Sequence, residues 1–151
     1  MKQEISKPDL SCAKSQMRPT IGVVTVTFNS APVLGPFLKC VLAQDLRNFI
    51  LYVVDNVSND ESTAILKELS DPRLRLILNS TNKGVAEGNN IGIRAALDDG
   101  CETILLLNND TEFSSTLFRT LYDGLAQCKT PMTTGKMLYF SSFRLWILSL
   151  D

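Results

Sequence analysis

The clearest feature of the chain is a set of four short apolar runs, separated by segments with helical periodicity. The runs occupy residues 21–27, 50–54, 74–78 and 104–107, and they are rich in Val, Ile and Leu. Continuous apolar runs of this length are typical of strands covered on both faces, as in a parallel sheet. We therefore predict four strands at these positions and a fifth near residues 137–140.

Helical patterns fill the intervals between the apolar runs. In the first interval the apolar positions fall on one helical face: Leu34, Phe37, Leu38, Val41 and Leu42. A further helix is expected over residues 84–97, where Gly88 and Gly92 share one face. Because glycine has no side chain, this face is predicted to approach the sheet closely.

Two helix starts are predicted from capping signals. Ser58 and Glu61 have the spacing of a capping box ahead of a helix that continues to Leu69. Ser114 is the expected cap of a last helix, whose apolar positions are Leu117, Leu121 and Leu125. The alternation of strands and helices predicts an α/β domain of three layers, α/β/α, with a mostly parallel sheet.

The amino-acid composition excludes several classes of function. The chain has 151 residues, a formal net charge of −1 and no histidine, which excludes histidine-based catalysis and argues against nucleic-acid binding. Cys12, Cys40, Cys101 and Cys128 form no CxxC pair, so reduced thiols are expected rather than a zinc site. Residues 1–20 are polar and are interpreted as a flexible lead-in without a signal peptide, followed by one domain over residues 21–151. No membrane span is expected, because the apolar tail is too short.

Polar side chains follow every predicted strand. Turns and caps explain any single loop of this composition. However, the carboxyl ends of parallel strands meet at one edge, which is where open α/β sheets bind ligands. Four polar loops at that edge predict a binding site, with these candidate residues: Thr27, Asn29, Asp55, Asn56, Asp60, Lys83, Gly84, Asn89, Asn108, Asn109 and Asp110.

Known phosphate and nucleophile motifs are absent. The chain has no GxGxxG after the first run, no P-loop and no GxSxG elbow. What remains is a set of carboxylates and amides. Asp110 suits a divalent cation such as Mg²⁺ or Mn²⁺, which takes one or two carboxylates and completes its shell with phosphate and water. Asp55 can accept hydrogen bonds from a base or ribose, and Lys83 with the amides near Gly84 can face phosphate.

Four segments in order resemble the family 2 glycosyltransferases, which have the GT-A fold, a Rossmann-like fold of nucleotide-diphospho-sugar transferases. They are IGVVTVTFNS at 21–30, VVDNVSNDES at 53–62, NKGVAEGNNIGIRAA at 82–96 and LLLNNDT at 105–111. The second is similar to the family's Asp-Asn-x-Ser-x-Asp nucleotide loop. The fourth lies where the family has its metal-binding Asp-x-Asp motif or a variant.

The resemblance implies a transferase that uses a nucleotide-diphosphate sugar and a glycan or lipid-linked acceptor. It implies that Asp55 contacts the base, Asn108 the ribose and Asp110 a Mg²⁺ or Mn²⁺ ion. The expected reaction is the transfer of a hexosyl or rhamnosyl group in polysaccharide biosynthesis, with inversion of the configuration of the sugar. The implied location is the cytoplasm, or the inner face of the membrane as a peripheral protein.

The chain departs from the family pattern in two ways. Asn108 replaces an acidic residue, and only 41 residues follow Asp110. In the family, the acceptor half and the general base lie further downstream, so the acceptor half is expected to be missing and the catalytic residue is unknown. The remaining carboxylates are not in the family's base context: Glu112, Asp123 and Asp151. Three alternatives stay open: an active transferase, a donor-binding fragment, or a non-catalytic interaction module, with self-association through an exposed sheet edge or tail.

Overall fold

The computed structural model describes residues 21–128, 132 and 133 of the chain, and within them it contains four strands. These are β1 (Ile21–Thr27), β2 (Phe49–Asp55), β3 (Leu74–Leu78) and β4 (Thr103–Leu106). Each lies within one residue of its predicted position. The predicted fifth strand and the predicted flexible lead-in lie outside the described residues, and the domain boundary at residue 21 stays a prediction.

The four strands form one parallel sheet in the order β3-β2-β1-β4. β1 is central, which explains why its apolar run is uninterrupted: both faces of the strand are covered and nearly every residue is buried. The register aligns Thr27 with Asp55 at the carboxyl ends of β1 and β2. The ends of the first two strands therefore lie side by side, which brings their following loops together.

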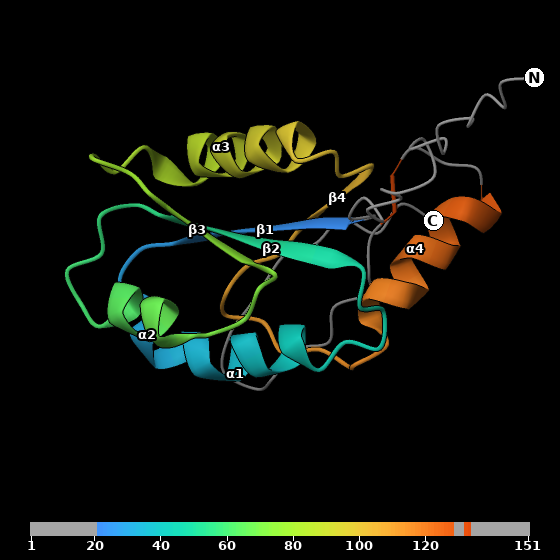
Figure 1. The fold of residues 1–151 in the computed structure, drawn as a ribbon, viewed down its shortest axis with the longest axis horizontal. Coiled ribbons are helices and arrows are strands. Elements are labelled where there is room, and N and C mark those ends of the chain that lie inside the picture. Colours follow the sequence, from blue (N-terminus) through green and yellow to red (C-terminus); the bar gives the residue numbers. More distant parts are fainter. Residues whose placement is uncertain (1–20, 129–131, 134–151) are drawn as a thin grey trace, which may run out of the picture.

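The four helices are α1 (Ala31–Leu42), α2 (Ser62–Glu68), α3 (Gly84–Asp98) and α4 (Leu117–Cys128). Figure 1 shows α3 along one face of the sheet and α1 with α2 along the other. The predicted three-layer α/β/α fold is thus confirmed. No helix in the described part of the chain combines the length and the apolar character needed to cross a bilayer.

The larger core lies between the sheet and helices α1, α2 and α4. Its fully buried members are Val23, Leu34, Phe37, Val41, Val53 and Phe118. The ring of Phe118 meets the ring of Phe49 edge to face at 5.2 Å, which fixes the start of α4 against the start of β2. Complete burial of a side chain of this size contributes about 1.5–3 kcal/mol, so this face carries much of the stability.

Helix α3 packs closely on the opposite face, as its glycines predicted. A Cβ at Gly88 would lie 2.8 Å from Cγ2 of Val26, and one at Gly92 would overlap Cγ1 of Val24. From the strand side, a Cβ at Gly22 would lie 2.6 Å from Cβ of Ala96. The missing side chains therefore let α3 lie directly on β1, and this sets the position of the amino end of α3 above the strand ends.

Both predicted helix caps are wrong. Helix α2 begins at Ser62, and the Ser58 hydroxyl accepts the backbone N–H of Asn29 at 2.9 Å instead of capping α2. Helix α4 begins at Leu117, and the N–H of Phe118 is accepted by the Gln44 side chain at 3.0 Å, while the Ser114 hydroxyl contacts that of Thr116. At α4 a partner distant in sequence takes the expected role of Ser114, whereas at α2 the carboxylate of the nearby Asp60 accepts the N–H of Ser62.

Candidate functional site at the carboxyl edge of the sheet

The candidate site lies at the carboxyl edge, which we define as the ends of the four strands with the loops that follow them. At its centre are Thr27 and Asp55, which are aligned in register and are 0% and 2% exposed. One carboxylate oxygen of Asp55, Oδ2, accepts the N–H of Ser58 at 3.0 Å. The other oxygen, Oδ1, is buried without a hydrogen-bond partner among the described residues, as is the hydroxyl of Thr27. Buried polar atoms without partners are rare, and they mark a place where a ligand can supply the missing bonds.

The loops after β1 and β2 are locked together by mutual hydrogen bonds. The carboxamide oxygen of Asn29 accepts the N–H of Asn59 at 2.7 Å, and the N–H of Asn29 reaches the hydroxyl of Ser58. Asn29 and Val57 both have positive φ, 51° and 66°. This backbone conformation is uncommon for Asn and costly for a β-branched residue. The loop contacts therefore hold a strained backbone next to Asp55.

Asp60 joins the two helices on this side. Its Oδ2 accepts the N–H of Ala31 at 2.9 Å and its Oδ1 accepts the N–H of Ser62 at 2.9 Å, so one carboxylate serves the first residue of both α1 and α2. Hydrogen bonding from Ser62, together with the bond from Ala31, holds the pKa of the Asp60 carboxyl below its usual range. Asp60 and Asn29 were predicted to contact a nucleotide-sugar donor. In the structure their side chains form hydrogen bonds that fix the loops.

Asn56 is 2% exposed and connects three loops. Its Oδ1 accepts Nδ2 of Asn79 at 2.7 Å, and its Nδ2 donates to the carbonyl of Gly84 at 3.1 Å. Asn79 was absent from the predicted site residues. Its position directly after the third apolar run could have indicated that it belongs to the site. In the structure its N–H continues the β2–β3 ladder, donating to the carbonyl of Asp55 at 2.9 Å.

The loop after β4 contributes one anchored and two free polar side chains. Nδ2 of Asn109 donates to the carbonyl of Val26 and to the hydroxyl of Ser30, both at 3.0 Å. Asn108 and Asp110 are exposed, and within the described part of the chain their side chains make no hydrogen bond. The Asp110 carboxylate therefore caps no described turn or helix and faces solvent.

Lys83, Gly84 and Asn89 lie at the amino end of α3. Lys83 is exposed and directly precedes the helix, and Gly84 has a φ of 76°. Asn89 is half-buried and its side chain has no hydrogen bond to any described residue. The nearby Glu87 is paired with Arg94 at 2.6 Å, and this bond lowers the pKa of the Glu87 carboxyl. Lys83 thus supplies a positive charge at the edge, next to the positive end of a helix dipole.

The edge offers a cation one carboxylate rather than a full set of ligands. No three acidic, Cys or His side chains gather within residues 21–128, 132 and 133. Asp110 is exposed and unpaired within that part of the chain. This fits Mg²⁺ or Mn²⁺ in sites where substrate phosphate and water complete the shell, because such ions need only one or two carboxylates from the protein.

Two solved structures share the fold. S. aureus TarS in complex with UDP superposes with a TM-score of 0.65 at 20% identity, covering 72% of this chain and 32% of that chain. The mannosyltransferase PcManGT from Pyrobaculum calidifontis, in complex with GDP-Man and Mn²⁺, gives 0.63 at 22% identity, covering 72% and 33%. At these identities the likeness concerns the fold, and it confirms the GT-A architecture.

Sequence relatives extend the comparison. The succinoglycan biosynthesis protein ExoO of Rhizobium meliloti is 35% identical over 78 residues, which are 52% of this chain and 22% of that protein. The dTDP-rhamnosyl transferase RfbF of Shigella flexneri is 30% identical over 105 residues, 70% of this chain and 34% of that protein. The chain thus spans about a fifth to a third of these relatives. The family model for glycosyl transferase family 2 matches residues 22–145, and the chain therefore belongs to this family.

Proposed function

We propose that the chain forms the donor-binding part of a metal-dependent glycosyltransferase that uses a nucleotide-diphosphate sugar and inverts the configuration of the sugar. The observation that carries the proposal is the pair of buried atoms without partners at the ends of β1 and β2, the Asp55 Oδ1 and the Thr27 hydroxyl. A carboxylate oxygen only accepts hydrogen bonds, so its ligand must present an N–H or O–H group. A nucleobase N–H meets that need at a water-poor position.

The exposed residues around this centre suit the other parts of a donor. In this proposal Asn108 hydrogen-bonds the ribose, and Lys83 with the first amides of α3 faces the diphosphate. Asp110 holds Mg²⁺ or Mn²⁺ at the phosphates. When bound, such an ion neutralises the charge that develops on the leaving diphosphate. Support for the metal comes from the exposed, unpaired Asp110 carboxylate and from the Mn²⁺ named for the structural neighbour PcManGT.

For the acceptor and the sugar, only the chemical class is proposed. The printed names of the relatives include succinoglycan biosynthesis and rhamnosyl transfer, which support a glycan or lipid-linked acceptor and hexosyl or rhamnosyl transfer. A cytoplasmic location, at the inner face of the membrane if peripheral, accompanies that proposal. Binding of a donor without transfer is a second candidate. Turnover of a nucleotide-diphosphate sugar separates the two candidates.

A thermal-shift titration tests the donor site. The chain is melted with UDP, GDP, dTDP and CDP, each with and without Mn²⁺. A ligand at about 100 times its dissociation constant adds about 2.7 kcal/mol, which raises the melting temperature by roughly 5–10 °C for a domain of this size. We expect one nucleotide to give this shift and Mn²⁺ to increase it.

Two variants test the roles proposed for Asp55 and Asp110 in nucleotide and metal binding. Asp55→Ala is expected to weaken nucleotide binding with and without metal, whereas Asp110→Ala is expected to remove only the part that depends on Mn²⁺. A cooperative melt that none of the four nucleotides moves would overturn the proposal. If Asp110→Ala keeps the Mn²⁺ effect, the metal assignment is wrong while the base assignment stands.

A further inference from the structure

Both polar atoms of the Asn56 side chain are hydrogen-bonded to protein groups. Its Oδ1 accepts Nδ2 of Asn79 at 2.7 Å and the N–H of Lys83 at 3.4 Å, and its Nδ2 donates to the carbonyl of Gly84 at 3.1 Å. An Asn carboxamide has two acceptor lone pairs and two N–H donors, so the acceptor side is fully used. Asn56 and Asp55 are equally buried, at 2% exposed, but Asn56 Oδ1 already has two protein partners whereas Asp55 Oδ1 has none, so Asn56 offers a ligand no free acceptor.

Two of the three side-chain hydrogen bonds of Asn56 lead to the start of helix α3. Asn56 binds the N–H of Lys83 and the carbonyl of Gly84, which are consecutive residues at the turn into the helix. Gly84 has a φ of 76°, and its own N–H is held by the side chain of Asn82 at 2.9 Å. The turn is therefore fixed from two sides, by Asn82 within the loop and by Asn56 from the neighbouring strand end.

The same residue ties this turn to the sheet. The backbone N–H of Asn56 donates to the carbonyl of Thr27 at 2.9 Å, and Asn79 contacts both Asn56 and the carbonyl of Asp55. Asn56 thus links the ends of β1, β2 and β3 to the amino end of α3. It connects the buried centre at Thr27 and Asp55 to Lys83, through its backbone on one side and its side chain on the other.

We propose that Asn56 is a positioning residue for the donor diphosphate: it holds Lys83 and the first turn of α3 where they meet the phosphates, and it does not touch the donor. This inference rests on the proposed function. It predicts that loss of Asn56 weakens binding of the diphosphate and leaves binding of the base and ribose intact, because Thr27 and Asp55 keep their backbone positions in the sheet.

Calorimetric titration in the presence of Mn²⁺ tests the inference. The probes are the nucleoside diphosphate that gives the thermal shift and the matching nucleoside, the latter measured by competition. The variants are Asn56→Ala, Lys83→Ala and the double variant. We expect Asn56→Ala to weaken the diphosphate about tenfold and the nucleoside less than about twofold. Because Asn56 acts in part through Lys83, the double variant should lose clearly less affinity than the two single losses combined.

Two further variants separate positioning from general damage. Gln44→Ala removes a fully buried carboxamide that also makes three hydrogen bonds, but near the starts of α4 and β2. It should lower the melting temperature without changing the ratio of diphosphate to nucleoside affinity. Asn79→Ala removes one contact of Asn56 and is the milder variant if Asn56→Ala fails to fold. It should weaken the diphosphate selectively, by less than Asn56→Ala does.

The results separate the positioning role of Asn56 from the proposed function. Equal losses for nucleoside and diphosphate, or additive losses in the double variant, would overturn the positioning role while the donor site stands. No binding of any nucleotide by the wild-type chain would overturn the proposed function, and this inference with it.

Discussion

The two ends of the sheet use the same kinds of side chain in different ways. At the amino edge, which we define by Gln44, Arg47, Asp71 and Arg73 around the starts of β2 and β3, polar groups bridge one element to another. Gln44 is fully buried; its Nε2 donates to the carbonyls of Cys40 at 3.0 Å and Ser114 at 2.7 Å, and its Oε1 accepts the N–H of Phe118.

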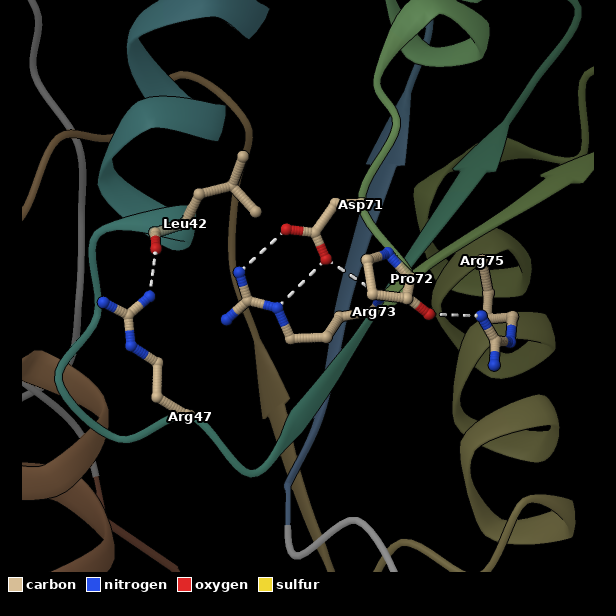
Figure 2. A network of polar contacts seen from close by, with 6 residues as sticks. All are labelled: Leu42, Arg47, Asp71, Pro72, Arg73 and Arg75. Atoms are coloured by element: carbon tan, nitrogen blue, oxygen red, sulfur yellow. Dashed lines mark hydrogen bonds and ion pairs between the residues drawn. The ribbon is translucent and has the colours of Figure 1, made fainter.

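The ion pair at the amino edge joins two residues that are only two positions apart, and the contact of Arg73 with Phe49 connects the pair to β2. Figure 2 shows the Asp71 carboxylate accepting two bonds from the Arg73 guanidinium, at 3.0 and 2.8 Å, and a third from the Arg73 backbone. The guanidinium also lies 4.4 Å from the centre of the Phe49 ring. This cation–π contact compensates in part for its buried Nη1, which has no hydrogen-bond partner among the described residues.

At the carboxyl edge, by contrast, polar atoms stay available. Asp55 keeps a buried oxygen without a partner, Asn108 and Asp110 are exposed with side chains that no described residue binds, and Val57 is held at positive φ. The residues that do form bonds there, such as Asn56 and Asp60, fix the loops around these free groups. The comparison indicates that the amino edge stabilises the domain, whereas the carboxyl edge keeps unpaired polar atoms and a strained backbone that cost stability, as the proposed donor site requires.

The largest change in stability is expected from Gln44→Ala. The substitution leaves the N–H of Phe118 unpaired, removes one hydrogen bond from each of the carbonyls of Cys40 and Ser114, and opens a cavity, which together cost about 3 kcal/mol. Urea unfolding measures this loss. Nucleotide affinity should stay unchanged, and a weaker affinity would break the division between the two edges.

A smaller change of opposite sign is expected from Val57→Gly. A left-handed conformation costs an L-residue about 1–2 kcal/mol, and glycine loses part of that gain through its greater backbone freedom in the unfolded chain. We expect a net stabilisation of about 1 kcal/mol in urea unfolding. A destabilised variant would show that the Val57 side chain contributes more packing than its 37% exposure implies.

Asp71→Asn tests whether the Asp71–Arg73 ion pair contributes to the pH dependence of stability. The Arg73 guanidinium lowers the pKa of Asp71, so the pair stabilises the fold above the unfolded pKa of about 3.9 and is lost as the pH falls through the lower folded value. At pH 7 the substitution should cost at most about 1 kcal/mol. Between pH 5 and pH 2 the wild-type chain should lose more stability than the variant. Parallel acid curves for the two proteins would exclude a contribution from this pair.

The smallest change in stability is expected from Asp110→Ala, because this carboxylate is exposed and bound by no described residue. The melting temperature without ligand should move by no more than about 2 °C, since surface changes of this kind stay within about 0.5 kcal/mol. A large drop in the unliganded melting temperature would give Asp110 a structural role and would blur the contrast between the edges.

Sequence reasoning located the elements well and the hydrogen-bond partners poorly. The apolar run at β1 and the glycines at 88 and 92 carry strong local signals, so the strands and the close approach of α3 were predictable. The Ser58–Glu61 pattern failed because Ser58 bonds to Asn29, 29 residues away. Likewise, the sequence placed Asn56 and Asp110 in one set of polar residues. Only the fold distinguishes a side chain that is hydrogen-bonded to protein groups from an unpaired one, because the side-chain partners of Asn56 lie 23 to 28 residues further along the chain.

The strand order has a consequence for how the chain is made. β1 is synthesised first, yet one of its two neighbours, β4, pairs with Ile21–Val24 through residues 103–106. At a translation rate of about 5–20 residues per second, the strand that becomes the centre of the sheet waits roughly 4–16 seconds for that neighbour to leave the ribosome. During this interval an apolar edge stays open to other nascent chains. Slower synthesis through residues 28–102 should therefore increase aggregation, and chaperones that cover early apolar segments should reduce it.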